Sequence, residues 1–261
     1  MKKKLIFLVS LLALSSLTAF AFGARGHSTV ASLADENLSG SVRKKIEHYL
    51  GRSMAFYASW MDQYREDPVY KHTTHWHTFP VDGNLNYSDD LLKAKRGNAV
   101  WALENAIKVL KDYKNYDDST VTVNLKYVIH LVGDLHCPSH VKYRDVEMGF
   151  KVIPYKGSKE SVSYHSVWDA EVIDRYCQAF SPQELARDFN RLSRKEIKEI
   201  QKGSVRDWAH ENAVNCRQIY DMAHEGDVLF KPFYNPAWPL VQSQITKAGY
   251  RLAGILNECF K

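Results

Sequence analysis

Cysteine is scarce in this sequence, and no two of the cysteines have a C-x-x-C spacing. The closed thiolate sites that hold structural zinc are therefore not predicted. An oxidising compartment would permit disulfides, but four cysteines allow three pairings and the sequence does not choose among them. The four are Cys137, Cys177, Cys216 and Cys259.

The sequence also lacks a linker rich in proline, glycine or serine, an internal repeat, a low-complexity tract and a long run of charge. Nothing therefore divides residues 22–261 into separate units, and we expect them to form one domain and a monomer. The formal net charge of +5 includes the lysines at positions 2–4, and it falls by 3 to about +2 without them. So small a charge says nothing about nucleic acid, and any attraction for phosphate must be local.

The apolar run near the N-terminus is too short to favour a membrane-spanning helix. It follows three lysines and ends in Ala-Phe-Ala at positions 19–21, which is the form of a secretory signal peptide. We therefore expect residues 1–21 to be removed, which makes Phe22 the mature N-terminus of a periplasmic or secreted protein without stable membrane insertion. An uncleaved membrane anchor is the alternative.

Helical patterns cover most of the remaining sequence, which predicts an all-α fold. Residues 120–136 are apolar nearly all round, as in a buried central helix. Strand signal is confined to residues 150–155 and a few residues before His165, which predicts a small irregular or hairpin excursion around 145–165. The helices are expected at about residues 41–50, 98–113, 120–136, 181–201, 204–224 and 239–260.

Three histidines and one aspartate lie within residues 130–140. His130 and Asp134 are at i and i+4, so on a helix their side chains leave the same face and can bind one metal ion. Pro138 then interrupts the helix, so we expect His140 to leave its axis and point elsewhere. One segment can in this way serve two metals.

A second pair, His165 and Asp169, repeats this spacing. Asp62 and His77 each lie within two residues of a tryptophan, and His27 lies five residues after the expected N-terminus. Nitrogen and carboxylate donors without clustered cysteines suit zinc in open, water-bearing sites. A surface ion pair or a satisfied core histidine is the alternative for each pair taken alone.

Five motifs share their residue types and order with one known family. The motifs are F-G-A-R-G-H at residues 22–27, S-W-M-D-Q-Y-R at 59–65, W-H at 76–77, H-L-V-G-D-L-H-C-P-S-H at 130–140 and Y-H-S-V-W-D at 164–169. Together they resemble the zinc-dependent S1/P1 nuclease family, which comprises single-strand nucleases and 3′-nucleotidases with the fold of zinc phospholipase C. The resemblance extends over nearly all of residues 22–261 and implies one multi-helix domain of that fold.

The resemblance also implies three zinc ions. Phe22 would bind through its backbone amino nitrogen and carbonyl oxygen, so phenylalanine in place of the family's usual tryptophan removes no donor atom. The implied ligands are Asp62, His77, His130 and Asp134 for the first zinc, His140, His165 and Asp169 for the second, and Phe22, His27 and Asp134 for the third.

The activity that the resemblance implies is hydrolysis of single-stranded DNA, RNA or 3′-nucleotides to products with a 5′-phosphate or a free 3′-hydroxyl, by a zinc-activated hydroxide. Asp62 and Asp134 would act at the metals, and Arg65 would contact a phosphate oxygen or orient Asp62. An ordinary helix ion pair is the alternative for Arg65.

Some positions depart from the family pattern and leave the substrate preference open. Cys137 stands where glutamine is common, and residues 148–150 read Met-Gly-Phe where Gly-Gly-Asn is expected. A phospholipase C and a non-catalytic zinc-binding envelope protein are the competing functions.

Overall fold

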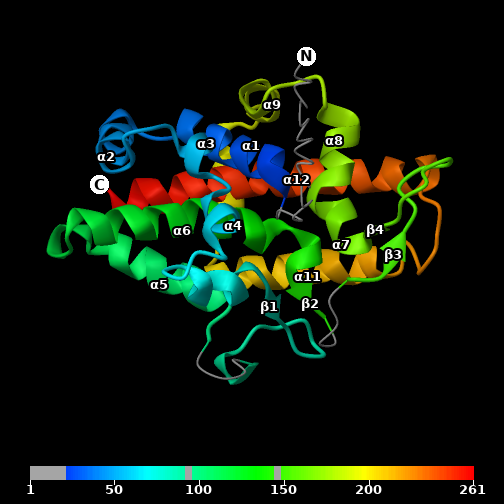
Figure 1. Cartoon of the computed structure of the whole chain (residues 1–261). Coiled ribbons are helices and arrows are strands. Elements are labelled where there is room, and N and C mark those ends of the chain that lie inside the picture. Colours follow the sequence, from blue (N-terminus) through cyan, green and yellow to red (C-terminus); the bar gives the residue numbers. More distant parts are fainter. Residues whose placement is uncertain (1–21, 92–95, 144–147) are drawn as a thin grey trace, which may run out of the picture.

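The computed structural model describes residues 22–91, 96–143 and 148–261 (Figure 1). The predicted signal peptide, residues 1–21, lies outside these ranges together with its cleavage point. Within them, helices predominate and the strands are short, which confirms the predicted all-α class. None of the helices in the described ranges has both the length and the apolar character needed to cross a membrane.

The described residues form α-helices that are joined by short helical turns and by two pairs of two-residue strands. The α-helices are α1 (Gly23–Glu36), α2 (Gly40–Leu50), α3 (Met54–Tyr57), α4 (Trp60–Tyr64), α5 (Ala99–Lys111), α6 (Asp118–His136), α7 (Tyr164–Ser166), α8 (Val172–Cys177), α9 (Pro182–Phe189), α10 (Arg194–Ile200), α11 (Val205–Tyr220) and α12 (Lys231–Cys259). The turns are η1 (Lys71–His77), η2 (Asp89–Leu91), η3 (Tyr113–Asn115), η4 (Pro138–His140) and the π-helical η5 (Val167–Glu171), and the strands are β1 (Phe79–Pro80), β2 (Val141–Lys142), β3 (Lys151–Val152) and β4 (Val162–Ser163).

α6 is the central helix, as its apolar sequence predicts. Every side chain from Tyr127 to His136 is buried. α6 packs against α5 on one side and α12 on the other, and α12 in turn carries α1 (Figure 1). The C-terminal half of α6, which contains the histidine-rich motif, is thus held in the interior of the helical assembly.

The prediction of one long helix between residues 181 and 201 is wrong, because the chain forms two helices there. α9 ends at Phe189, and Ser193 begins α10 with a capping box of its own. The side chain of Ser193 accepts a hydrogen bond from the backbone of Glu196, whose carboxylate accepts one from the backbone of Ser193. This reciprocal pair starts a helix, so the charged stretch divides.

The last helix also differs from the prediction, because α12 begins at Lys231 rather than near Pro239. Pro232 occupies the first turn, where the missing backbone donor has no helical partner in any case. Pro236 and Pro239 then lie inside the helix. Sequence patterns treat an internal proline as a boundary, and here the packing of the helix outweighs that preference.

The short strands join segments that carry the motifs. β1 pairs in parallel with β2, with Phe79 opposite Val141, and so ties the residues after His77 to those after His140. β3 and β4 pair antiparallel just before α7, which confirms a hairpin in the described part of the expected excursion. Residues 144–147 of that excursion lie outside the described ranges.

Candidate metal centre

α6 contributes His130 and Asp134, both fully buried. His130 Nε2 lies 3.1 Å from Asp134 Oδ2, so the two side chains leave the same face as their spacing predicts. His130 Nδ1 donates to the carbonyl oxygen of Ala58 at 2.8 Å. That hydrogen bond fixes the ring and leaves Nε2 as the atom that can bind a metal.

His27 comes from the first turns of α1 and stacks on His130, with ring centroids 4.2 Å apart. Its Nε2 lies 3.4 Å from Asp134 Oδ1. This approach requires glycine at position 133, since a Cβ atom there would lie 2.5 Å from His27 Nδ1. The glycine of the H-L-V-G-D motif thus provides the space that brings α1 and α6 together.

Phe22 precedes α1 and is fully buried in a left-handed backbone conformation, with φ of 42°. Its carbonyl oxygen accepts a hydrogen bond from the amide of Gly26 at 2.9 Å. Its ring lies edge-on to His27, with centroids 6.5 Å apart. The expected N-terminal residue therefore contacts His27 through its side chain.

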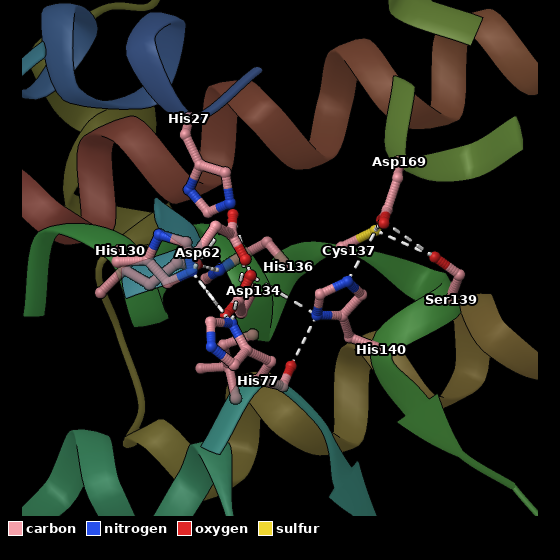
Figure 2. Close-up of polar contacts among 12 residues, drawn as sticks. His27, Asp62, His77, His130, Asp134, His136, Cys137, Ser139, His140 and Asp169 are labelled. Atoms are coloured by element: carbon pink, nitrogen blue, oxygen red, sulfur yellow. Dashed lines mark hydrogen bonds and ion pairs between the residues drawn. The ribbon is translucent and has the colours of Figure 1, made fainter. Parts of the chain in front are cut away.

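Asp62 on α4 and His77 at the end of η1 reach the same cluster from the other side. His77 Nδ1 lies 3.0 Å from Asp134 Oδ2 and 3.5 Å from Asp62 Oδ1. His130 Nε2 is 3.8 Å from Asp62 Oδ2. The central cluster, which we define as His27, Asp62, His77, His130 and Asp134, therefore combines four segments of the chain (Figure 2).

A second group of histidine and aspartate side chains lies beside the central cluster. We call it the outer cluster; it consists of His140 at the end of η4, His165 on α7 and Asp169 on η5. His140 Nε2 lies 3.2 Å from Asp169 Oδ1, and His165 Nε2 lies 3.0 Å from Asp169 Oδ2. His140 leaves the axis of α6, as Pro138 predicts, and its Nδ1 donates to the carbonyl oxygen of His77 at 2.6 Å.

Two residues that the sequence did not single out as part of a site also reach Asp169. Cys137 Sγ lies 2.9 Å from Asp169 Oδ1, and Ser139 Oγ lies 3.2 Å from the same oxygen (Figure 2). Burial and the negative charge of Asp169 raise the pKa of the Cys137 thiol well above its usual value. Their position directly before His140, within the motif, was the signal that could have found them.

Buried carboxylates control the pKa values of the histidines in the two clusters. Burial alone would lower the pKa of His130, but Asp134 and Asp62 raise it to about 9. Burial would also lower the pKa of His140, but Asp169 and Asp134 outweigh it and raise that pKa to about 9. Burial and the charge of His130 lower the pKa of His27. Three buried carboxylates thus make the site attractive to cations.

The unpaired atoms of these side chains fit bound metal ions. Buried polar atoms without a partner are destabilising and uncommon in folded proteins. Three groups of side chains each offer potential ligand atoms that lie within 4.8 Å of one another. The groups are His27 with Asp62 and His130, His77 with His130 and Asp134, and Cys137 with His140 and Asp169. The atoms without a hydrogen-bond partner are His27 Nδ1 and Nε2, Asp62 Oδ2, His77 Nε2, Asp134 Oδ1, His140 Nε2 and Asp169 Oδ2.

A cleft of about 430 Å³ opens over both clusters. Asp62, His77, His140, His165 and Asp169 line it from the metal-binding side. Two cationic side chains, Arg65 and Lys142, line it as well. The described residues include no carboxylate paired with Arg65, so the helix ion pair considered for it is not formed.

Three further residues lie outside the cleft. His136, although it is in the histidine-rich motif, donates to the carbonyl oxygen of Val132 and accepts from Arg251. Phe79 is fully buried in the core. Asp82 accepts hydrogen bonds from the backbone of Asn84 and Asn86, and so shapes a turn.

Comparison with known proteins gives matches along the whole described chain. The sequence is 26% identical to Nuclease S1 of Aspergillus oryzae over 277 aligned positions, which cover 94% of each chain. It is 25% identical to Endonuclease 3 of Arabidopsis thaliana, with 98% of this chain and 95% of the relative covered. It is 24% identical to Nuclease P1 of Penicillium citrinum, with 91% and 97% covered.

The family model described as S1/P1 Nuclease matches residues 22–261. The match includes every residue of the central and outer clusters, and it begins at the residue expected to be the mature N-terminus. The motifs, the mainly helical fold and this match agree, and the chain belongs to the S1/P1 nuclease family.

Proposed function

We propose that this protein is a zinc-dependent phosphodiesterase that cleaves single-stranded DNA and RNA to products with a 5′-phosphate, and that it also removes phosphate from 3′-nucleotides. The observation that carries the proposal is the position of unpaired histidine and carboxylate atoms directly beneath a cleft with cationic side chains. The relatives named Nuclease S1, Nuclease P1 and Endonuclease 3 support the nuclease assignment.

The proposed ligands form three zinc sites. The short distances between histidine nitrogens and carboxylate oxygens within the central and outer clusters support the sets that the family resemblance implies. Phe22 takes part through its backbone, which requires removal of residues 1–21 and hence secretion or export to the periplasm. The sets are Asp62, His77, His130 and Asp134; His140, His165 and Asp169; and Phe22, His27 and Asp134.

Zinc is the best match to this donor set, because imidazole and carboxylate ligands that leave an open position are typical of catalytic zinc. When bound, the metals supply Lewis acidity and lower the pKa of water. Oδ1 of Asp134 lies near His27 and His140, and its Oδ2 lies near His77 and His130. It is therefore placed to bridge two metal sites.

The side chains of the cleft bind and orient the phosphodiester. Arg65 and Lys142 neutralise the charge of non-bridging phosphate oxygens. Asp62 lines the cleft and accepts the proton of the attacking water. The new bond forms between the water oxygen and phosphorus, the bond from phosphorus to the 3′-oxygen breaks, and that oxygen takes up a proton from solvent.

A side-by-side assay tests the function. The purified protein is incubated with single-stranded DNA, RNA, 3′-AMP and phosphatidylcholine, with and without a chelator. We expect hydrolysis of the first three substrates, loss of activity with the chelator and recovery on adding Zn²⁺. Activity on the lipid alone would contradict the nuclease proposal, and metal binding without turnover on any substrate would identify a zinc-binding protein instead.

A further inference from the structure

Cys137 lies in the turn between α6 and η4 and is fully buried. Its thiol is 2.9 Å from Asp169 Oδ1 and 3.2 Å from Ser139 Oγ. The backbone of this turn is itself held in place, because the side-chain amide of Asn212 donates to the carbonyl oxygens of Leu135 and Cys137 at 2.9 and 2.8 Å. The thiol therefore occupies a fixed position next to the carboxylate.

The two oxygens of Asp169 have different surroundings. Oδ1 accepts hydrogen bonds from the Cys137 thiol and the Ser139 hydroxyl, and it also lies 3.2 Å from His140 Nε2. Oδ2 accepts none from the described residues and lies 3.0 Å from His165 Nε2. A carboxylate with donors on one oxygen only is held in a single orientation, with the other oxygen available to a cation.

We propose that Cys137, together with Ser139, is a positioning residue that holds Oδ1 of Asp169 so that Oδ2 faces the metal bound by His140 and His165. The inference rests on the proposed metal site. It explains why a cysteine suits this position, since its side chain is small enough for a fully enclosed space and donates one hydrogen bond to a buried carboxylate.

The geometry favours a positioning role over direct coordination by sulfur. The thiol lies against the oxygen that is already occupied, whereas the unpaired oxygen and His165 Nε2 are neighbours of each other. His140, His165 and Asp169 Oδ2 would hold the metal through nitrogen and oxygen atoms without the sulfur. The thiol hydrogen stays on sulfur and is shared with Oδ1.

The test compares Zn²⁺ binding by the unchanged protein, Cys137→Ala, Cys137→Ser and Cys216→Ala. Each metal-stripped protein is titrated with buffered Zn²⁺, and bound metal is counted by elemental analysis. Cys216 is the matched control, because it is also fully buried and donates to the carbonyl oxygen of Val141, away from Asp169. We expect Cys137→Ala to bind one zinc about 10–100-fold more weakly, the usual effect of losing an outer partner of a ligand. Cys137→Ser keeps a donor and should bind nearly as the unchanged protein does, and Cys216→Ala should bind all its metals.

Substitution with Co²⁺ provides a second readout that depends on the bound atoms. If Cys137 only positions Asp169, the cobalt-loaded protein should show no sulfur-to-cobalt charge-transfer band from Cys137, and its spectrum should match that of Cys137→Ser. Such a band would identify Cys137 as a ligand and overturn the proposal. Unchanged affinity in Cys137→Ala, or equal defects in the alanine and serine variants, would also overturn it. If the unchanged protein binds no metal, the proposed function itself fails.

Discussion

Asp134 is the single residue on which most of the site converges. Its Oδ1 lies 3.4 Å from both His27 Nε2 and His140 Nδ1. Its Oδ2 lies 3.0 Å from His77 Nδ1 and 3.1 Å from His130 Nε2. The buried histidines in turn lower the pKa of Asp134 well below its usual range, even though burial alone would raise it. A full negative charge at this point is therefore integral to the site.

The variant Asp134→Asn is expected to lose at least one zinc and to lose activity by at least about 100-fold, because changing even an outer partner of a ligand typically reduces activity about 10–100-fold. Elemental analysis and the nuclease assay measure the two losses. Asp174→Asn is the control, since that carboxylate is half exposed and pairs with Arg25 away from the clusters. Full metal content and full rate in Asp134→Asn would refute the bridging role.

A substitution at Gly133 tests whether the close approach of α1 and α6 is needed for the site. In Gly133→Ala the new methyl group would displace the His27 ring, from which an ideal Cβ is only 2.5 Å away. We expect about 1–3 kcal/mol of lost stability from the overpacking, together with weaker binding of one zinc. Denaturant unfolding and metal counting are the measurements.

Gly249→Ala is the matched control for this variant, because its Cβ would meet the Leu33 side chain at 2.6 Å and no proposed ligand is among its nearest atoms. It should lose similar stability but keep all its metals. If both variants retain their metals, His27 does not depend on the space at Gly133.

The sequence was sufficient to predict which histidine and aspartate side chains the structure gathers into the two clusters, because H-x-x-x-D pairs, an interrupting proline and family motifs are local patterns. It was not sufficient to find the contacts of Cys137 and Ser139 with Asp169. Those contacts join residues that are 32 and 30 positions apart, through the way η4 and η5 pack together. No periodicity in the sequence encodes them.

Among the structural elements, α6 is fixed in place by a buried polar network with α11 and α12. Arg251 on α12 donates to His136 Nε2 at 2.8 Å and to the carbonyl oxygen of Ile200 at 2.9 Å. It also pairs with Glu211 on α11, which Lys247 contacts as well. Burial and the charge of Arg251 lower the pKa of His136 to about 3, so its ring is neutral and able to accept.

Replacing Arg251 with methionine keeps the length of the side chain but leaves His136, Ile200 and Glu211 without this donor. Breaking a fully buried pair costs about 3–5 kcal/mol, and since a third of the Glu211 side chain is exposed we expect about 2–3 kcal/mol. Denaturant unfolding gives the value. Arg191→Met, which removes an exposed pair with Asp188, should change stability by less than about 0.5 kcal/mol. Similar small changes in both variants would show that the network is not important for stability.

A separate prediction concerns Phe22, the residue that precedes α1. A form extended before Phe22 should be weakly active, because its residue 22 has an amide in place of the amino group that would bind metal. Proteolytic trimming to Phe22 should restore activity and one zinc, as followed by assay, mass spectrometry and metal counting. Equal activity before and after trimming would show that the terminus is not a ligand.

Helix existence was predicted better than helix boundaries. The apolar patterns of α5 and α6 and the glycine that ends α2 located those helices to within a few residues. The break between α9 and α10 and the early start of α12 were missed. In both places a local signal had two meanings: S-x-x-E can begin a second helix as well as continue a charged face, and proline can lie inside a helix whose neighbours support it.

For the whole molecule, bound metal is expected to be a major part of stability. Without metal, the clusters would hold buried carboxylates and histidines close together while several of their polar atoms have no partner. A site filled at about 1,000 times its Kd adds about 4 kcal/mol. For a protein of this size each kcal/mol shifts Tm by about 2–4 °C, so emptying even one site should lower Tm by about 8–16 °C.

Thermal unfolding with and without a chelator measures this difference, and adding Zn²⁺ back should restore the original Tm. Mg²⁺ serves as the control ion, since it prefers oxygen ligands and should not substitute at histidine-rich sites. A Tm unaffected by the chelator would mean that the fold forms without metal.

The clusters also determine when, during folding, metal can be captured. The proposed ligands come from segments between α1 and η5, but α1 and α6 are aligned by α12, the last helix of the chain. Closing such long loops is slow relative to forming single helices. We therefore expect a growing chain that already contains every proposed ligand to bind metal poorly until α12 has packed, so that metal uptake accompanies the completion of folding.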